Sequence, residues 1–432
     1  STGALGTTTP SRSPAVAKDQ KDFFKEKKPW SEVKDELLAC YLRPYFQKVL
    51  HTRKPVRYID CFAGRGNFDD GKLGSPLIAL NTARDCITAA KGPNTDIALT
   101  FIETDWASEL NVIAAAQEHV KQPRVRYSVV NGRFERDTYR IVQGMTGQNV
   151  FLYIDPYGVR NLAHNLITRF ADPSLGLFSI ELLINLNSFG FLRAGCLAMK
   201  VRYQDDVALR DDDEFAEEWS SNARSVEALN AIAGGDYWQA VVHAFKRKEI
   251  DGYRAEVSFA AQYRAKLGET YRYVLSMPIR LQDRQHPKYR MVYATNHAEG
   301  CILMADNMMT RTDNLAIHLP SYQQDSLFDE GVDGEITDPS YVQGQVRAIT
   351  DKLRSFTSTS EAIADFYAQE GVICKTDVIR KALRQMEKDG TITVKRDPCL
   401  TSTGKPSTFF TSAKGQKVLI RVTEAASRRA AH

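Results

Sequence analysis

The sequence predicts an α/β fold in which a mainly parallel sheet carries helices on both faces. Strand-like apolar segments alternate with helix-like segments between residues 58 and 186, which is typical of repeated strand–helix–strand units. The segment 58–67 runs from an apolar strand into a glycine turn, and the segment 150–158 ends another strand on an Asp-Pro pair. Because the carboxyl ends of parallel strands meet at one edge of a sheet, we expect these two strand ends to form one active site.

Length and composition exclude several classes of protein. With 432 residues the chain exceeds one typical core, so two or three domains are expected. Its 43% hydrophobic and 25% charged residues are ordinary for a soluble globular protein. No apolar run is long enough for a membrane helix, and the start of the chain lacks the apolar core of a signal peptide. We therefore expect a cytoplasmic protein without a membrane partner.

The seven cysteines stand singly, with no CxxC pair among them. Such spacing argues against a structural zinc site and against a disulfide framework. It favours a reducing compartment, and no bound metal is expected. The net charge of +4 says little until it is localised along the chain.

The first domain is predicted to span residues 21–324. It follows a tail, residues 1–20, that is rich in Ser, Thr, Ala, Gly and Pro and is predicted to be disordered. A helix is expected from about residue 29 with Ser31 as its N-cap, and Ser75 before Pro76 predicts a second helix start. After the strand that begins near residue 58, further strands are predicted at 97–102, 125–130, 150–154 and 179–186.

The segment 188–268 has a helical pattern and is predicted to be an insertion that covers the cleft. Its acidic run, 211–214, is interpreted as a solvated face. The segments 271–281 and 289–295 predict a pair of strands joined through a turn-rich stretch. This pair would complete a seven-stranded sheet, with the insertion between the fifth and sixth strands.

The last part of the chain predicts a small separate domain. Asp, Glu and Gly dominate residues 325–340, which indicates an interdomain linker. Residues 341–425 predict three helices and then two strands around a basic loop, the order of a winged helix. The helices are placed at 342–356, 360–369 and 376–389, and the strands at 391–394 and 407–411. From residue 341 onward, 16 Lys and Arg stand against 9 Asp and Glu, a formal charge of +7.

The glycine turn suggests a chemistry. Gly64 and Gly66 let the backbone approach a ligand closely, although any tight strand-to-helix turn uses such glycines. Glu103 is placed to accept from a ribose diol, and the alternative is a surface carboxylate near a helix start. The turn lacks a GxxxxGK[ST] phosphate motif, and Asp69 and Asp70 follow it. Acidic neighbours repel phosphate and favour a sulfonium and an amino group, so S-adenosylmethionine is favoured over ATP or NAD.

Five motifs occur in order along the first domain. They are Phe62-Ala63-Gly64-Arg65-Gly66, Gly74-Ser75-Pro76-Leu77-Ile78-Ala79, Glu103, Asn131-Gly132-Arg133-Phe134 and Ile154-Asp155-Pro156-Tyr157-Gly158. Together they resemble the Rossmann-like S-adenosylmethionine-dependent methyltransferases, and within them the bacterial ribosomal RNA adenine-N6 methyltransferases. The whole chain most resembles the bacterial and phage family called three-Cys-motif partner proteins, whose Cys motif belongs to a radical-SAM-type partner. The resemblance implies a Rossmann-like seven-stranded methyltransferase fold with a helical insertion, plus a C-terminal winged-helix domain.

The resemblance also implies roles for the matched residues. Those implied to bind S-adenosylmethionine are Lys34, Asp60, Phe62, Ala63, Gly64, Gly66, Ser75, Glu103, Asn131, Gly132 and Phe134. Those implied to be catalytic are Asp155, Pro156, Tyr157 and Gly158. Asp155 would accept from the exocyclic amine of a target base, and Tyr157 would stack on its ring. For Lys34 the alternative is an ordinary surface lysine.

The catalytic motif departs from that of the amine-methylating relatives. They carry Asp-Pro-Pro-Tyr or a close variant, whereas this chain has Asp-Pro-Tyr-Gly, so the aromatic ring stands one place early. Adenine-N6 methylation is therefore not the only activity that the motif allows. Asp155 could act on another acceptor group as a general base, or could hold the cofactor alone.

Basic residues gather in the predicted winged helix. They are Arg380, Lys381, Arg384 and Lys388 on the third helix, and Lys395, Arg396 and Lys405 around the wing. This pattern is typical of a phosphate-binding surface, although winged helices also bind proteins. The first hypothesis is therefore a methyltransferase that acts on a base in DNA or RNA, which the winged helix delivers. The alternative is a catalytically silent methyltransferase fold that serves as the nucleic-acid-binding partner of a radical-SAM-type protein.

Overall fold

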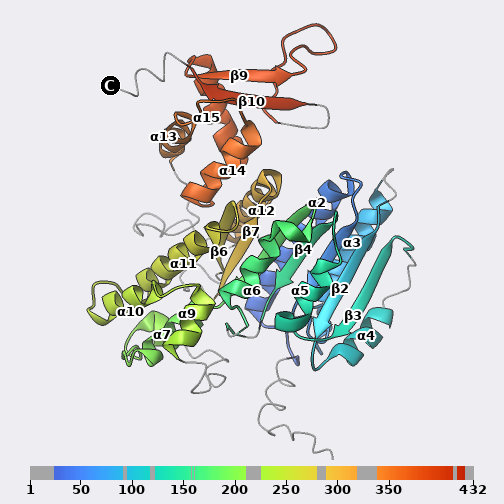
Figure 1. Cartoon of the computed structure of the whole chain (residues 1–432), viewed down its shortest axis with the longest axis vertical. Coiled ribbons are helices and arrows are strands. Elements are labelled where there is room, and N and C mark those ends of the chain that lie inside the picture. Colours follow the sequence, from blue (N-terminus) through green and yellow to red (C-terminus); the bar gives the residue numbers. More distant parts are fainter. Residues whose placement is uncertain are drawn as a thin grey trace, which may run out of the picture.

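A seven-stranded sheet forms the centre of the fold (Figure 1). The structure, a computed structural model, describes residues 24–90, 95–116, 122–156, 158, 159, 161–210, 225–279, 289–318, 338–411 and 416–423. The strands are β1 (Val56–Asp60), β2 (Ile97–Glu103), β3 (Val125–Asn131), β4 (Asn149–Ile154), β5 (Ser179–Leu186), β6 (Tyr273–Ile279) and β7 (Tyr289–Thr295). Their order, β3-β2-β1-β4-β5-β7-β6, confirms the predicted α/β class and is consistent with a Rossmann-like fold.

The strand directions place a crevice at one edge of this sheet. β1 to β5 pair in parallel, and β7 runs antiparallel between β5 and β6. β1 lies between β2 and β4, so the strand order reverses at β1. The connections leave the carboxyl ends of β1 and β4 in opposite directions, which opens a crevice between them.

Helices cover both faces of the sheet. One face packs against α2 (Pro29–Leu50), α3 (Ser75–Ala89) and α12 (Ala298–His318), and the other against α5 (Tyr139–Gln143) and α6 (His164–Thr168). Side chains alternate between these two cores, because Tyr58 and Tyr153 belong to the first whereas Ile59 and Leu152 belong to the second. Every position of β4 and β5 is buried, which explains why β4 is apolar from Val150 to Ile154 and why most of β5 is apolar.

The helix starts differ from the predicted ones by a residue or two. α2 begins at Pro29 with Lys28 as its N-cap, and α3 begins at Ser75 with Gly74 as its N-cap. Neither N-cap residue caps its helix through a side-chain hydrogen bond. The Ser75 hydroxyl instead donates to Asp60 Oδ2 at 2.6 Å, which removes it from the capping role predicted for it.

The helical segment between β5 and β6 in the chain is fixed to the sheet by a buried ion pair. Its helices are α7 (Ser188–Ala198), α8 (Val207–Arg210), α9 (Val226–Ala233), α10 (Trp238–Lys246) and α11 (Gly252–Gly268). Arg290 of β7 donates to both carboxylate oxygens of Glu256 in α11, at 2.9 and 2.8 Å. Both side chains are almost fully buried, and Ser188 donates to the same carboxylate. The acidic run 211–214 lies outside the described residues.

The C-terminal part consists of three helices and a three-stranded sheet. Its elements are α13 (Pro339–Thr350), β8 (Thr357–Ser358), α14 (Thr359–Glu370), α15 (Thr376–Lys388), β9 (Ile392–Asp397) and β10 (Lys417–Val422). The strand predicted at 407–411 is wrong, because β10 comes later in the chain. Arg396 donates to the Phe409 carbonyl at 2.8 Å and covers the ring of the buried Phe410, so this stretch packs as a loop.

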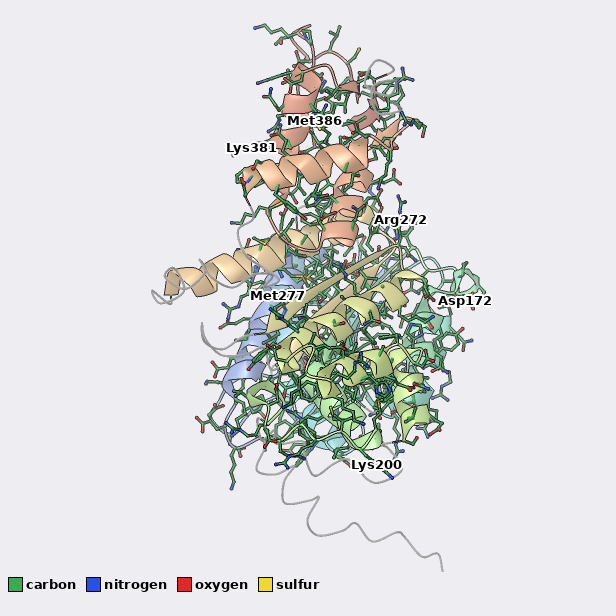
Figure 2. All side chains as sticks on the ribbon, turned by 90° about the vertical axis from the view of Figure 1, so that its left-hand side faces the viewer. Asp172, Lys200, Arg272, Met277, Lys381 and Met386 are labelled. Carbon is green, nitrogen blue, oxygen red and sulfur yellow. The ribbon has the colours of Figure 1, made fainter. Side chains whose placement is uncertain are left out.

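This C-terminal part packs at the amino-terminal edge of the parallel strands, opposite the crevice. Arg272, just before β6, pairs with Glu361 of α14 at 3.1 Å, and Figure 2 shows Arg272 at the junction. Glu299 of α12 accepts from Ser360, and Asp306 accepts from the backbone of Thr376 at 2.8 Å. One apolar core continues from α12 into α14 and α15. Within the described ranges, no helix is both long and apolar enough to cross a membrane.

Candidate functional site

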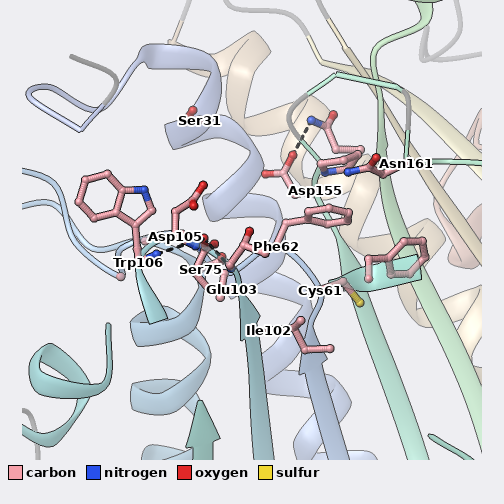
Figure 3. A pocket seen from close by; sticks show the side chains of 18 of the residues that line it. Ser31, Cys61, Phe62, Ser75, Ile102, Glu103, Asp105, Trp106, Asp155 and Asn161 are labelled. Atoms are coloured by element: carbon pink, nitrogen blue, oxygen red, sulfur yellow. Dashed lines mark hydrogen bonds between the residues drawn. The ribbon is translucent and has the colours of Figure 1, made fainter. Parts of the chain in front are cut away.

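A cavity of about 760 Å³ lies at the carboxyl edge of the sheet. Its walls come from the ends of β1, β2, β4 and β5, the start of α2, and the segment around Phe24. Figure 3 shows Trp106 and Asp155 at opposite sides of it, with Glu103 and Ser75 between them. The predicted residues that line the cavity are Lys34, Phe62, Ala63, Gly64, Gly66, Ser75, Glu103, Gly132, Phe134, Asp155 and Pro156. The two strand ends singled out in the sequence therefore meet at one site.

Some predicted site residues lie elsewhere. Asp60 is fully buried behind the wall, where it contacts Ser75. Asn131 is exposed at the end of β3, and Gly158 is partly buried, but neither lines the cavity. Tyr157, the predicted stacking residue, lies outside the described part of the chain. No described residue of the segment 188–268 lines the cavity, so the predicted cover is not found among them.

The glycines of the turn are required by the chain itself. Gly64 and Gly66 have φ angles of 63° and 97°, which residues other than glycine rarely adopt. A Cβ on Gly66 would lie 2.6 Å from Leu110, and one on Gly132 would lie 2.6 Å from Asp137. The backbone conformation of the turn therefore requires glycine whether or not a ligand approaches it closely, as was predicted.

Glu103 ties the glycine turn to the end of β2. Its Oε2 accepts from the backbone of Gly64 at 2.8 Å, and its Oε1 accepts from the backbones of Thr104 and Asp105 at 2.9 Å. Burial raises the pKa of this carboxyl, and the backbone hydrogen bonds oppose that rise. A carboxylate oxygen accepts about two hydrogen bonds, so Oε2 retains a place for a ligand hydroxyl.

Asp155 is held by three side chains. Lys34 of α2 donates to both of its oxygens, at 2.9 and 2.8 Å. Asn185, at the end of β5, donates its Nδ2 to Oδ1 at 2.7 Å, and the Tyr153 hydroxyl lies 3.3 Å from Oδ2. The Lys34 side chain is 10% exposed and also lies over the Tyr289 ring. Lys34 therefore reaches the cavity as the resemblance implied, but in this structure its partner is Asp155.

Two further aspartates lie at the cavity: Asp60 is buried behind its wall, and Asp35 lines it. Burial raises the pKa of Asp60 to about 7, while hydrogen bonds from Ser75 and from the Phe62 backbone oppose the rise. Burial raises the pKa of Asp35 to about 6, against the effect of Lys27, which pairs with it at 2.6 Å. Negative charge is therefore costly in this region and is partly suppressed near neutral pH.

The cavity is acidic, but not through the residues on which the prediction relied. Asp69 pairs with Arg65, Asp70 accepts from the Lys27 backbone, and neither lines the cavity. The acidic residues that line the cavity are Asp35, Glu103, Asp105, Glu135 and Asp155. The basic residues that line it are Lys34 and Arg133. Because acidic residues outnumber basic ones in the lining of the cavity, a cationic ligand is still favoured over a phosphate, although the acidic residues are not the predicted ones.

Sequence reasoning missed two groups of lining residues. Phe24 packs on Phe68 and Trp106 with ring centroids 5.6 and 5.4 Å apart, and these aromatic rings form one wall. No motif marks Phe24, which comes just after the predicted tail. Asn185 and Tyr289 line the side near Asp155. Asn185 could have been found as the polar residue near the carboxyl end of an apolar strand.

The predicted nucleic-acid-binding residues differ in exposure. Lys381, Arg384 and Lys388 are exposed on one face of α15, and Lys395 and Lys405 are exposed around β9. Figure 2 shows Lys381 on the C-terminal part. Two residues are less exposed. The Arg380 side chain pairs with Asp377 and is 21% exposed, and the Arg396 side chain holds Glu387 through two bonds of 2.7 Å and is 11% exposed.

Across the described parts of the chain, no group of three or more His, Cys, Asp or Glu side chains is placed to hold a metal ion. No protein-family model matches the chain, and no curated protein matches it. Among solved structures, the X-ray structure of YjhP from E. coli aligns with 65% of this chain and 98% of its own, at 10% identity and a TM-score of 0.25. A likeness at that score carries no argument, so the function is inferred from the site itself.

The raised pKa of Asp60 predicts that the free energy of unfolding of the protein depends on pH. The unfolded carboxyl releases its proton near its ordinary value of 3.8, whereas the folded one keeps it to about pH 7. Stability should therefore fall as pH rises between these values. The Asp60→Asn variant has no carboxyl to ionise and so does not lose this stability. The free energy of unfolding of the variant minus that of the wild type should therefore increase by roughly 2–3 kcal/mol between pH 5 and pH 8. Urea unfolding of both proteins at several pH values measures this, and a constant difference would contradict it.

Proposed function

We propose that this protein is an S-adenosylmethionine-dependent methyltransferase that acts on a base in DNA or RNA. The observation that carries the proposal is the meeting of Glu103, the glycine turn and Asp155 in one acidic cavity at the point where the strand order reverses. Ligands of open α/β sheets bind at such points. The resemblance of the sequence motifs supports the same assignment.

The cavity fits the proposed cofactor in charge and in the kinds of group it presents. Glu103 Oε2 would accept from a ribose hydroxyl beside the backbone of Gly64. The aromatic rings of Phe134 and Trp106 would flank the adenine, and the acidic lining would favour the cationic sulfonium and amino groups. S-adenosylmethionine supplies an electrophilic methyl group on its sulfur.

The chain's own residues would place the acceptor of that methyl group. Phe62 and Pro156 line the cavity with apolar surface next to Asp155. Lys34 and Asn185 fix the carboxylate of Asp155, so that the polar end of the cavity has a defined geometry before a ligand enters. Such preorganisation keeps a bound base from rotating away from the methyl donor. The acceptor's proton would pass to water or to a carboxylate of the cavity as the new bond forms.

We also propose that the C-terminal part is a winged-helix domain that binds nucleic acid through α15. The exposed face with Lys381, Arg384 and Lys388 supports this, since rows of basic side chains on a helix contact phosphates. This domain packs at the edge of the sheet opposite the cavity. It would therefore hold a long nucleic acid at a distance from the target base, instead of inserting that base itself.

The alternative function is a catalytically silent fold that serves a radical-SAM-type three-Cys-motif protein as a nucleic-acid-binding partner. One observation favours it: both Asp155 oxygens already accept hydrogen bonds from the protein. Binding of S-adenosylmethionine separates the two functions, because the silent protein needs no methyl donor.

Calorimetry with S-adenosylmethionine and S-adenosylhomocysteine tests the cofactor assignment. The wild type should bind both at micromolar concentration, and Glu103→Gln should weaken binding at least about tenfold through the lost ribose contact. Glu109→Gln, on the exposed face of α4 (Ala107–Ala116), is the matched control and should bind as the wild type does. Absence of binding at millimolar cofactor would exclude the methyltransferase.

The role of α15 is tested by replacing Lys381, Arg384 and Lys388 together with Ala. Binding of a duplex DNA or RNA should weaken, and its dependence on salt should become shallower, because fewer counterions are released. The control replaces three exposed basic residues far from α15, Arg210, Lys246 and Arg254. Equal effects of the two triple variants would show that α15 is not the nucleic-acid surface.

A further inference from the structure

Resting on the function proposed above, we infer that one uncovered face of the central sheet is a second nucleic-acid surface, which binds the phosphate backbone next to the cavity. This surface lies at β1, β2 and β3 and is separate from the basic face of α15. We call it the open face, and it consists of Arg57, Ala98, Thr100, Arg126 and Ser128.

The pleat of the strands directs polar side chains to the open face. Leu99 of β2 and Tyr127 of β3 pack into the core below α3 and α4, and alternate side chains of a strand point to opposite sides. Arg126 and Ser128 are exposed on the other side, and Thr100 is partly buried there. β3 is the outer strand of the sheet (Figure 1). None of the helices that the structure describes therefore shields these positions from solvent.

The register of the strands brings two arginines together. Arg57 stands opposite Ala98, and Ala98 stands opposite Arg126. The two arginines thus flank a small side chain at a separation of two strand spacings, about 10 Å between their backbones. Burial lowers the pKa of Arg57, and the nearby charge of Arg126 lowers it further. Like charges repel, so an anion bound beside both guanidinium groups would be stabilised.

The present partner of Arg126 can be replaced by a ligand. Arg126 pairs with Asp96 at 2.8 Å, and the two side chains are 64% and 39% exposed. An ion pair this exposed contributes little to stability. A guanidinium group presents five N–H donors in a fork that matches a phosphate group. The exposed hydroxyl of Ser128, 3.4 Å from that of Thr100, is a further hydrogen-bonding group beside it.

More arginines stand on the same side of the sheet. Phe134 packs in the core on this side and anchors η1 (Phe134–Thr138), which α5 continues. Arg136 and Arg140 project from these helices with side chains 72% and 75% exposed, and both pair with the buried carboxylate of Asp137. Two guanidinium groups that share one carboxylate leave positive charge for a ligand.

The open face leads to the cavity. Ile102, two residues beyond Thr100 on the same side of β2, lines the cavity, and so does Arg133, just before η1. At its other end the open face begins with Arg57 and Arg126, near the amino-terminal ends of β1 and β3.

The charge of the cavity explains why a backbone needs this path. The acidic lining repels phosphate, so a nucleic acid whose base enters the cavity must keep its backbone outside. The C-terminal part packs at the amino-terminal edge of the sheet, and the cavity lies at the carboxyl edge. A backbone on the open face would run from the first edge toward the second, over basic and hydroxyl side chains.

The test titrates the full chain with an RNA of about 40 nucleotides and a DNA duplex of about 40 base pairs, at several salt concentrations. For the nucleic acid that binds, Arg126→Ala should reduce the slope of log affinity against log salt by about one, which is about tenfold weaker binding at about 0.1 M salt. Ser128→Lys adds a charge to the open face and should tighten binding by a similar factor.

Arg43→Ala is the matched control. Its exposed side chain pairs with Asp85 at 2.8 Å, as Arg126 pairs with Asp96, but it projects from α2 on the other side of the sheet. Its affinity for the same nucleic acid should stay within about twofold of the wild type, because a remote exposed charge is screened by salt.

Each result decides the matter. Absence of nucleic-acid binding in the wild type, or equal effects of Arg126→Ala and Arg43→Ala, would overturn the inference. So would changes that appear only in the binding of polyglutamate, which would make the open face a site for an acidic protein. Ser128→Lys decides the inference even if Arg126→Ala does not fold.

The proposed methyltransferase is tested separately. Neither Arg126 nor Ser128 lines the cavity, so both variants should bind S-adenosylhomocysteine as the wild type does. The expected changes in nucleic-acid binding without any binding of S-adenosylhomocysteine would support the open face while refuting the methyltransferase. Binding of S-adenosylhomocysteine with no difference between Arg126→Ala and Arg43→Ala would do the reverse.

Discussion

The ion pair between Lys34 and Asp155 is the interaction on which the geometry of the cavity depends. It joins α2 to the end of the central strand β4 and is largely shielded from water, with side chains 10% and 21% exposed. A shielded pair cannot lose one partner without leaving an unpaired charge, so α2 is held against the sheet at this point. Asn185, on β5, donates to the same carboxylate of Asp155.

The sequence allowed much of the fold to be predicted, because buried strands require apolar side chains and tight turns require glycine. The seven strands and the meeting of the turn at Gly64 with Asp155 follow from such patterns. The errors arose where a side chain had two possible partners. The Ser75 hydroxyl bonds Asp60 instead of capping its helix, and Arg396 bonds the loop backbone where a strand was expected. Phe24 entered the wall through a long-range contact that no local pattern reveals.

The C-terminal part does not lie next to the cavity, although the sequence led us to expect that it delivers a base there. A continuous apolar core and ion pairs such as that of Arg272 with Glu361 fix this part at the amino-terminal edge of the sheet. α15 and the carboxyl ends of the parallel strands, where the cavity lies, are therefore at different ends of the molecule, and Figure 1 shows α15 beyond the opposite edge of the sheet. A nucleic acid bound by both must extend along the protein, which suits a long substrate better than a short one.

A crystal structure of the protein grown with S-adenosylhomocysteine is the sharpest test of the proposed cofactor site. We predict that the ligand lies along the glycine turn, with a ribose hydroxyl on Glu103 Oε2 and its adenine beside Phe134. The cluster of Lys34, Asp155 and Asn185 should keep the arrangement of the free protein. A cavity that stays empty at saturating ligand, or a ligand bound away from Glu103, would contradict this prediction.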